Sequence, residues 1–120
     1  MCLIFFALQQ HEKYPLIIAA NRDEFYARQT AAAGFWPEDE RILAGRDLEA
    51  CEPQRGCGTW LGVSRNGRLA LVTNYRDPKN INPKAPSRGH LVSAYLRGTD
   101  EPEHYLHKLQ PEAPRYNGFN

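Results

Sequence analysis

The stretch "TWLGVSRNGRLALVTNYR" (Thr59–Arg76) is the segment from which the fold can be worked outward. Two apolar runs, residues 59–64 and 68–76, lie on either side of Asn66 and Gly67. The Asn-Gly pair readily adopts the positive φ angles that a tight turn between antiparallel strands requires. The segment therefore predicts a β-hairpin, and with it an antiparallel sheet.

A second hairpin is predicted at the start of the chain. "CLIFFAL" (residues 2–8) and "LIIAA" (residues 16–20) are short apolar runs typical of buried strands. The polar segment between them ends in Pro15 and favours a turn, so the two runs are expected to pair. This pairing would bring Arg22 and Asp23, which follow the second strand, close to Cys2.

The segment from Tyr26 to Pro53 has no clear periodicity, and we expect it to be mostly loop. Within it, "TAAAGFWPEDE" mixes small, aromatic and acidic residues, and "ACEPQRGCG" is rich in turn formers. Only "RILAGRD" (residues 41–47) is expected to hold a short strand.

Two helices are predicted in the last third of the chain. The first lies within residues 87–98, with Ser87 as its cap and Gly98 as its stop. The second starts near Asp100, which has capping-box spacing to Glu103. The tail "RYNGFN" resembles the beginning of another strand. Strands followed by helices indicate an α+β fold.

The composition excludes several classes of function. A chain of 120 residues predicts one domain. A net charge of +1 leaves no strong field for nucleic acid, so no nucleic-acid partner is expected. No apolar segment approaches the roughly 20 residues of a membrane-spanning helix. No secretory signal is evident, which predicts a cytoplasmic protein without an integral membrane segment.

Three cysteines are an odd number and do not make a disulfide framework. A local disulfide between Cys51 and Cys57 is one reading, but reduced loop thiols are favoured for a cytosolic protein. No metal-binding spacing is present and the four histidines are dispersed, so no metal or other cofactor is expected.

Cys2 is the residue with the clearest chemical potential. If Met1 is removed, Cys2 carries a thiol and a free α-amino group, which has a pKa of about 8 and can accept the thiol proton. Asp23 would orient the amine, Arg22 would favour a thiolate, and the Asn74 amide would donate to an oxyanion. Each residue also has an ordinary structural role: a buried cysteine, a charged turn and a strand end.

Several motifs together are similar to one known family. They are "MC.IFF", "AANRDE", "AGRD", "GTWLGVS..GRLALVTNYR", "SRG.LV" and "YNGFN", in this order along the chain. The chain resembles the NRDE family, which includes the transport-and-Golgi-organisation proteins and is similar to the N-terminal nucleophile hydrolases. The resemblance implies the N-terminal part of a four-layer αββα sandwich with antiparallel sheets. It also implies that residues 1–120 are a single NRDE-type domain, the N-terminal half of a longer one.

The resemblance also assigns roles in the hydrolase pattern. Cys2 matches the nucleophile, Asn21 and Asp23 match an N-x-D motif, and Asn74 matches the oxyanion-hole asparagine. The hydrolase arginine that precedes N-x-D is Ala20 here. Arg22 is not expected to replace it, because adjacent strand residues point to opposite faces.

Two functions follow from the resemblance. The first is a cysteine hydrolase acting on a non-peptide C–N (amide) bond of a small-molecule substrate, with Asn21 and Arg22 as substrate contacts. The alternative is a non-catalytic carrier of haem or lipid-like hydrophobic cargo, related to the Golgi organisation and transport proteins.

Overall fold

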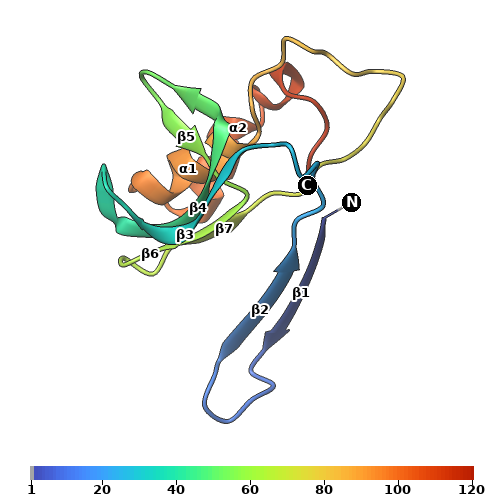
Figure 1. The fold of residues 1–120 in the computed structure, drawn as a ribbon. Helices are drawn as coiled ribbons and strands as arrows, with labels where there is room; N and C mark the ends of the chain where they lie inside the picture. The colour runs from blue at the N-terminus through green and yellow to red at the C-terminus, as the bar shows by residue number, and fades with distance from the viewer. Residues whose placement is uncertain (1) are drawn as a thin grey trace.

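The computed structural model describes residues 2–120 as an α+β fold with two antiparallel sheets (Figure 1). The α+β class with antiparallel sheets is confirmed, and the arrangement is compatible with the first part of a four-layer αββα sandwich. The elements along the chain are β1 (Leu3–Leu8), β2 (Leu16–Asn21), β3 (Thr30–Trp36), β4 (Asp39–Glu52), β5 (Gly56–Gly58), β6 (Leu61–Ser64), β7 (Leu69–Leu71), α1 (Gly89–Arg97), α2 (Pro102–Leu109) and the 3₁₀ helix η1 (Ala113–Arg115).

The hairpin of β6 and β7 forms as predicted. The strands pair antiparallel from Leu61↔Leu71 to Val63↔Leu69, and Gly67 adopts a φ of 78° in the turn. Strand β7 ends earlier than expected, and Asn74 instead makes an isolated antiparallel bridge with Phe119. The tail of the chain therefore begins to pair with this segment, as its sequence indicated.

The prediction of a loop between Tyr26 and Pro53 is wrong. Strands β3 and β4 form a long hairpin there, and β4 also pairs with β5 and β6 in the five-stranded sheet. The small residues of β3 carry little local strand signal, but the ladder with β4 satisfies their backbone groups. Trp36 is buried at the end of β3 and donates its Nε1–H to the carbonyl of Ala44, at 3.2 Å.

The expectation of reduced loop thiols at Cys51 and Cys57 is also wrong. The two residues are direct partners in the β4–β5 ladder and are joined by a disulfide. Strand pairing, which the sequence pattern does not reveal at this point, places the two sulfurs side by side.

Strands β1 and β2 pair antiparallel from Leu3↔Asn21 to Leu8↔Leu16, as predicted. The expected burial of the two strands is wrong, because Phe5 is 67% and Phe6 is 75% exposed. Figure 1 shows the hairpin extending away from the rest of the molecule. Among residues 2–120, no layer covers its two faces enough to bury these rings.

The core lies between the five-stranded sheet and α1. Helix α1 contacts β4, β5, β6 and β7, and one face of the helix is buried. The buried apolar cluster consists of Trp36, Ile42, Ala44, Val72, Val92, Tyr95 and Leu96, with Ala70, Tyr105 and Phe119 packed against it.

The start of α1 approaches the sheet at backbone distance. A Cβ atom added to Gly58 would lie 3.0 Å from the carbonyl carbon of Gly89, and one added to Gly89 would lie 3.0 Å from the nitrogen of Thr59. The Thr59 N–H donates to the Gly89 carbonyl, at 3.2 Å. The "GTW" and "SRG" motifs are thus in direct contact, which fixes the first turn of α1 against β5.

The expected helix caps are only partly correct. Helix α1 ends at Arg97, before Gly98, as predicted, but its N-cap is Arg88; Ser87 Oγ instead accepts a hydrogen bond from the Gly89 N–H. The capping box of Asp100 and Glu103 does not form, because α2 starts at Pro102 and Asp100 bonds Lys108.

Candidate functional site

A cleft of about 540 Å³ lies where the base of the β1–β2 hairpin meets the five-stranded sheet. Cys2, Arg22, Asp23 and Asn74 all line it, and Cys2 is half-buried. Asn21 is not part of the lining; it is the last residue of β2 and is exposed. Four of the five residues singled out in the sequence thus share one cavity.

The hairpin register explains how these residues come together. Leu3 pairs with Asn21, so Cys2, just before β1, lies beside the segment that follows β2. Strand alternation does not fix the direction of the Arg22 side chain, because β2 has already ended at Asn21. The Arg22 side chain reaches the cleft, and its guanidinium stacks over the Trp60 ring at 4.3 Å.

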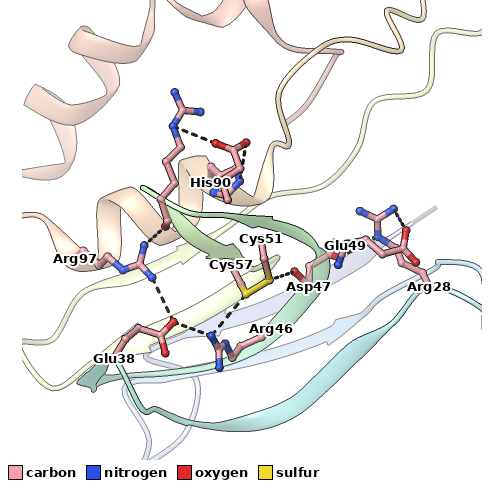
Figure 2. Close-up of a disulfide and its surroundings, with 11 residues drawn as sticks. Arg28, Glu38, Arg46, Asp47, Glu49, Cys51, Cys57, His90 and Arg97 are labelled. Atoms are coloured by element: carbon pink, nitrogen blue, oxygen red, sulfur yellow. Dashed lines mark hydrogen bonds and ion pairs between the residues drawn. A yellow bond between two sulfur atoms is a disulfide. The ribbon is translucent and has the colours of Figure 1, made fainter.

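Asp47 organises the charged wall of the cleft. Its carboxylate is buried and accepts hydrogen bonds from Arg22 Nη2 at 3.3 Å and from Arg28 Nε at 3.0 Å. The Glu49 N–H also donates to Asp47, at 3.2 Å. In Figure 2 the side chains of Arg28 and Glu49 lie beside Asp47. The "AGRD" motif therefore provides the anion that holds two guanidinium groups at the cleft.

Arg28 is firmly held in its charged form. Burial alone lowers its pKa, but the hydrogen bond and charge of Asp47, together with Glu24 and Glu49, raise the pKa above its usual value. A fixed cation in this position can stabilise negative charge without costly reorganisation.

Arg88 is the functional candidate that sequence reasoning missed. It lines the cleft at the start of α1, and its Nη1–H donates to the carbonyl of Gly118 at 2.8 Å. Burial lowers the pKa of Arg88, the charge of Glu24 opposes this, Arg28 lowers it further, and Cys2 opposes it again. Arg88 and Cys2 line the same cleft.

Comparison with known proteins places the chain in a family. The family model described as Transport and Golgi organisation 2 matches residues 1–120.

The chain belongs to the Transport and Golgi organisation 2 family.

Relatives with this family name come from vertebrates and insects. The chain is 45% identical over 124 residues to the Transport and Golgi organization protein 2 homolog of Bos taurus. It is 44% identical over 124 residues to the homolog of Homo sapiens and 35% identical over 133 residues to the protein of Drosophila melanogaster. Each match covers 100% of the chain and 44% of the relative, so the chain spans less than half the length of these relatives.

The family match covers the cleft, the disulfide and the hairpin, since it extends over the whole chain. Within residues 2–120 no group of three or more His, Cys, Asp or Glu side chains is placed to hold a metal ion. None of the helices described in residues 2–120 is long and apolar enough to cross a membrane.

The sequence did carry a signal for part of what was missed. Asp47 lies in the "AGRD" motif and Arg88 in "SRG", both of which belong to the Transport and Golgi organisation 2 resemblance. Both residues had an ordinary local explanation, a strand and a helix cap, and only the fold shows that they face Cys2's cleft.

Proposed function

We propose that this chain carries the nucleophile half of a cysteine N-terminal nucleophile hydrolase, acting on a non-peptide amide bond of a small molecule. The observation that supports this proposal is the shared lining: Cys2, Asp23 and Asn74 border one cleft. A nucleophile, a carboxylate and an amide donor are the groups that such a reaction requires.

The proposed reaction starts once Met1, which lies outside the described residues, has been removed. The α-amino group of Cys2 takes the thiol proton, and the sulfur attacks the amide carbon. The oxyanion accepts a hydrogen bond from the Asn74 side-chain amide, while Asp23 orients the ammonium group. The substrate amine leaves with the proton, and water then hydrolyses the thioester to a carboxylic acid and frees the sulfur.

Fixed cations around the cleft support this chemistry. Arg88 and Cys2 line the same cleft, so Arg88 places a cation in the cavity where the oxyanion would form. Arg22, anchored by Asp47 and Trp60, is positioned to contact the substrate. In the hydrolase pattern an arginine occupies the position of Ala20; in the proposal Arg88 supplies that charge from a different segment.

The alternative is a carrier of haem or lipid-like cargo without catalysis. The cleft is lined largely by charged and polar residues, which suits a polar ligand better than a lipid-like one. The exposed apolar faces of the β1–β2 hairpin are the feature that favours the carrier alternative.

The proposal extends to the organisation and location of the protein. Residues 1–120 would be the N-terminal half of one longer domain, in keeping with the coverage of 44% of the relatives. The complete protein would act in the cytoplasm.

The N-terminus of the purified protein is first determined by mass spectrometry. The protein is then assayed for hydrolysis of a panel of N-acyl-aminocoumarin amides with different acyl groups. We expect amine release that is abolished in Cys2→Ala, and fast labelling of Cys2 by iodoacetamide. Gln10→Ala serves as the control, because Gln10 is exposed between β1 and β2 and is not part of the cleft lining. Retention of Met1, or unchanged turnover in Cys2→Ala, contradicts the hydrolase. Haem binding equal in wild type and Cys2→Ala, without amide turnover, identifies a carrier.

A further inference from the structure

The Cys51–Cys57 disulfide has two sulfurs in different surroundings. Cys51 is exposed and lines the cleft, whereas Cys57 is 5% exposed and is not part of the lining. A thiolate that enters the cleft can therefore reach one sulfur of the pair and not the other. Attack on a disulfide is directed by this kind of access.

The buried sulfur has a cation beside it. Arg46 Nη2 lies 3.6 Å from Cys57 Sγ. Figure 2 shows Arg46 beside the disulfide. The same Nη2 donates to Glu38 Oε1 at 2.8 Å, and the guanidinium lies over the Trp36 ring at 5.9 Å. The Arg46 guanidinium is thus held in place by an anion and an aromatic ring.

A cation in this place favours negative charge on Cys57 and so makes Cys57 the better leaving group. On the other side, Cys51 Sγ lies 3.5 Å from the carbonyl oxygen of Asp47, which can accept the S–H of a Cys51 thiol. Exposure of one sulfur and stabilisation of the other as a thiolate are the two properties of a disulfide that exchanges readily.

We propose that Cys51–Cys57 is a redox-active disulfide that reacts with small-molecule thiols in the cleft, with Cys51 attacked and Cys57 as the leaving sulfur. The thiolate RS⁻ forms a new S–S bond with Cys51 Sγ. The Cys51–Cys57 bond breaks, and its electron pair goes to Cys57 Sγ beside Arg46.

A second RS⁻ completes the reaction by attacking the outer sulfur of the mixed disulfide. RSSR is released, and the two protein sulfurs take up the two protons that the thiols lost. Two RSH are oxidised to RSSR, while the protein disulfide is reduced to two thiols. Because Cys51 lies in the cleft wall, the intermediate adduct projects into the cavity that Cys2 also lines.

The first test locates the attacked sulfur. Both variants carry Cys2→Ser, so that only the disulfide cysteines are counted. Cys57→Ser and Cys51→Ser are each incubated with oxidised glutathione, and adducts are followed by intact mass. We expect rapid adduct formation on Cys51 in Cys57→Ser and at least severalfold slower formation on Cys57 in Cys51→Ser. Equal rates, or faster reaction at Cys57, overturn the proposal.

The second test measures the effect of Arg46 on the leaving sulfur. The Cys51–Cys57 disulfide is reduced with dithiothreitol, and the reaction is quenched with a maleimide mass tag that labels the thiols formed. We expect Arg46→Gln to slow reduction by about threefold or more, because the leaving sulfur loses its cation. Arg46→Lys should retain most of the rate, and Arg41→Gln, which removes an exposed guanidinium bound to Asp39, should leave it unchanged. An unchanged rate in Arg46→Gln overturns the role of Arg46. If that variant does not fold, the two adduct rates still decide which sulfur is attacked.

Discussion

His90 Nε2 lies 3.3 Å from Glu52 Oε1, although the His90 side chain is only 4% exposed. Neither ring nitrogen of His90 has a hydrogen-bond partner of good geometry among the described residues, so the contact with Glu52 is electrostatic. Burial lowers the pKa of His90, Glu52 opposes this, Arg55 and Arg97 lower it further, and Asp47 opposes it. The net pKa lies below its usual value, so the fold favours the neutral ring.

The depressed pKa of His90 predicts a loss of stability in acid. The unfolded chain binds a proton at a pKa of about 6.5. The folded chain binds it only at lower pH, so the contribution is fully present above the unfolded pKa and is lost as pH falls toward the folded pKa. Urea unfolding at about pH 7.5 and about pH 5.5 should show a decrease of at most about 1.4 kcal/mol per pH unit.

A matched pair of variants separates His90 from the general effect of acid. His90→Gln should flatten this part of the pH dependence, whereas His107→Gln, at an exposed position of α2, should leave it unchanged. An equal pH slope in wild type and His90→Gln would show that His90 is not the responsible group.

Asp47→Asn should destabilise the protein by about 2 kcal/mol, because it leaves the partly buried Arg22 and Arg28 guanidinium groups without their shared anion. The measurement is the free energy of unfolding in urea. Glu112→Gln is the control, since its ion pair with Arg115 is exposed on both sides and should contribute little. Equal effects of the two variants would contradict the organising role of Asp47.

Gly58→Ala should destabilise the protein by about 1–3 kcal/mol, because its Cβ would press against the backbone of Gly89. Gly34→Ala is the matched control in the same sheet, since a Cβ there meets no atom within 4 Å. Thermal unfolding of the two variants gives the comparison. A tolerated Gly58→Ala would mean that α1 can move away from β5 without loss.

Arg88→Gln should slow the labelling of Cys2 by iodoacetamide severalfold near neutral pH, because it removes a cation from the cleft that Cys2 lines. Arg115→Gln, with an exposed guanidinium outside the cleft, should label at the wild-type rate. The intact disulfide keeps Cys51 and Cys57 out of the count, provided no reductant is present. Identical rates in the two variants would remove Arg88 from the site.

The sequence predicted those elements whose signals are local. Asn66 and Gly67 determine a turn by their own backbone preferences, and the stripe of Leu91, Val92, Tyr95 and Leu96 determines a helix face. It also placed Cys2 near Arg22 and Asp23, because a hairpin brings its two open ends together.

The missed features depend on contacts between distant segments. The ladder of β3 and β4 gives structure to small residues that have no strand preference of their own. The disulfide follows from the register of β4 and β5. Arg88 precedes Gly89, which with Gly58 lets α1 start directly against the sheet, and this places Arg88 at the cleft.

The β1–β2 hairpin links the position of Cys2, the proposed nucleophile, to a surface far from the cleft. Cys2 directly precedes β1, whereas Asn74 follows β7 in the other sheet, and within residues 2–120 the two sheets share no ladder. A small tilt of the β1–β2 hairpin would therefore change the distance between the Cys2 thiol and the Asn74 amide. In the proposed hydrolase, a contact with the exposed Phe5 and Phe6 side chains would therefore change the distance from Cys2 to Asn74.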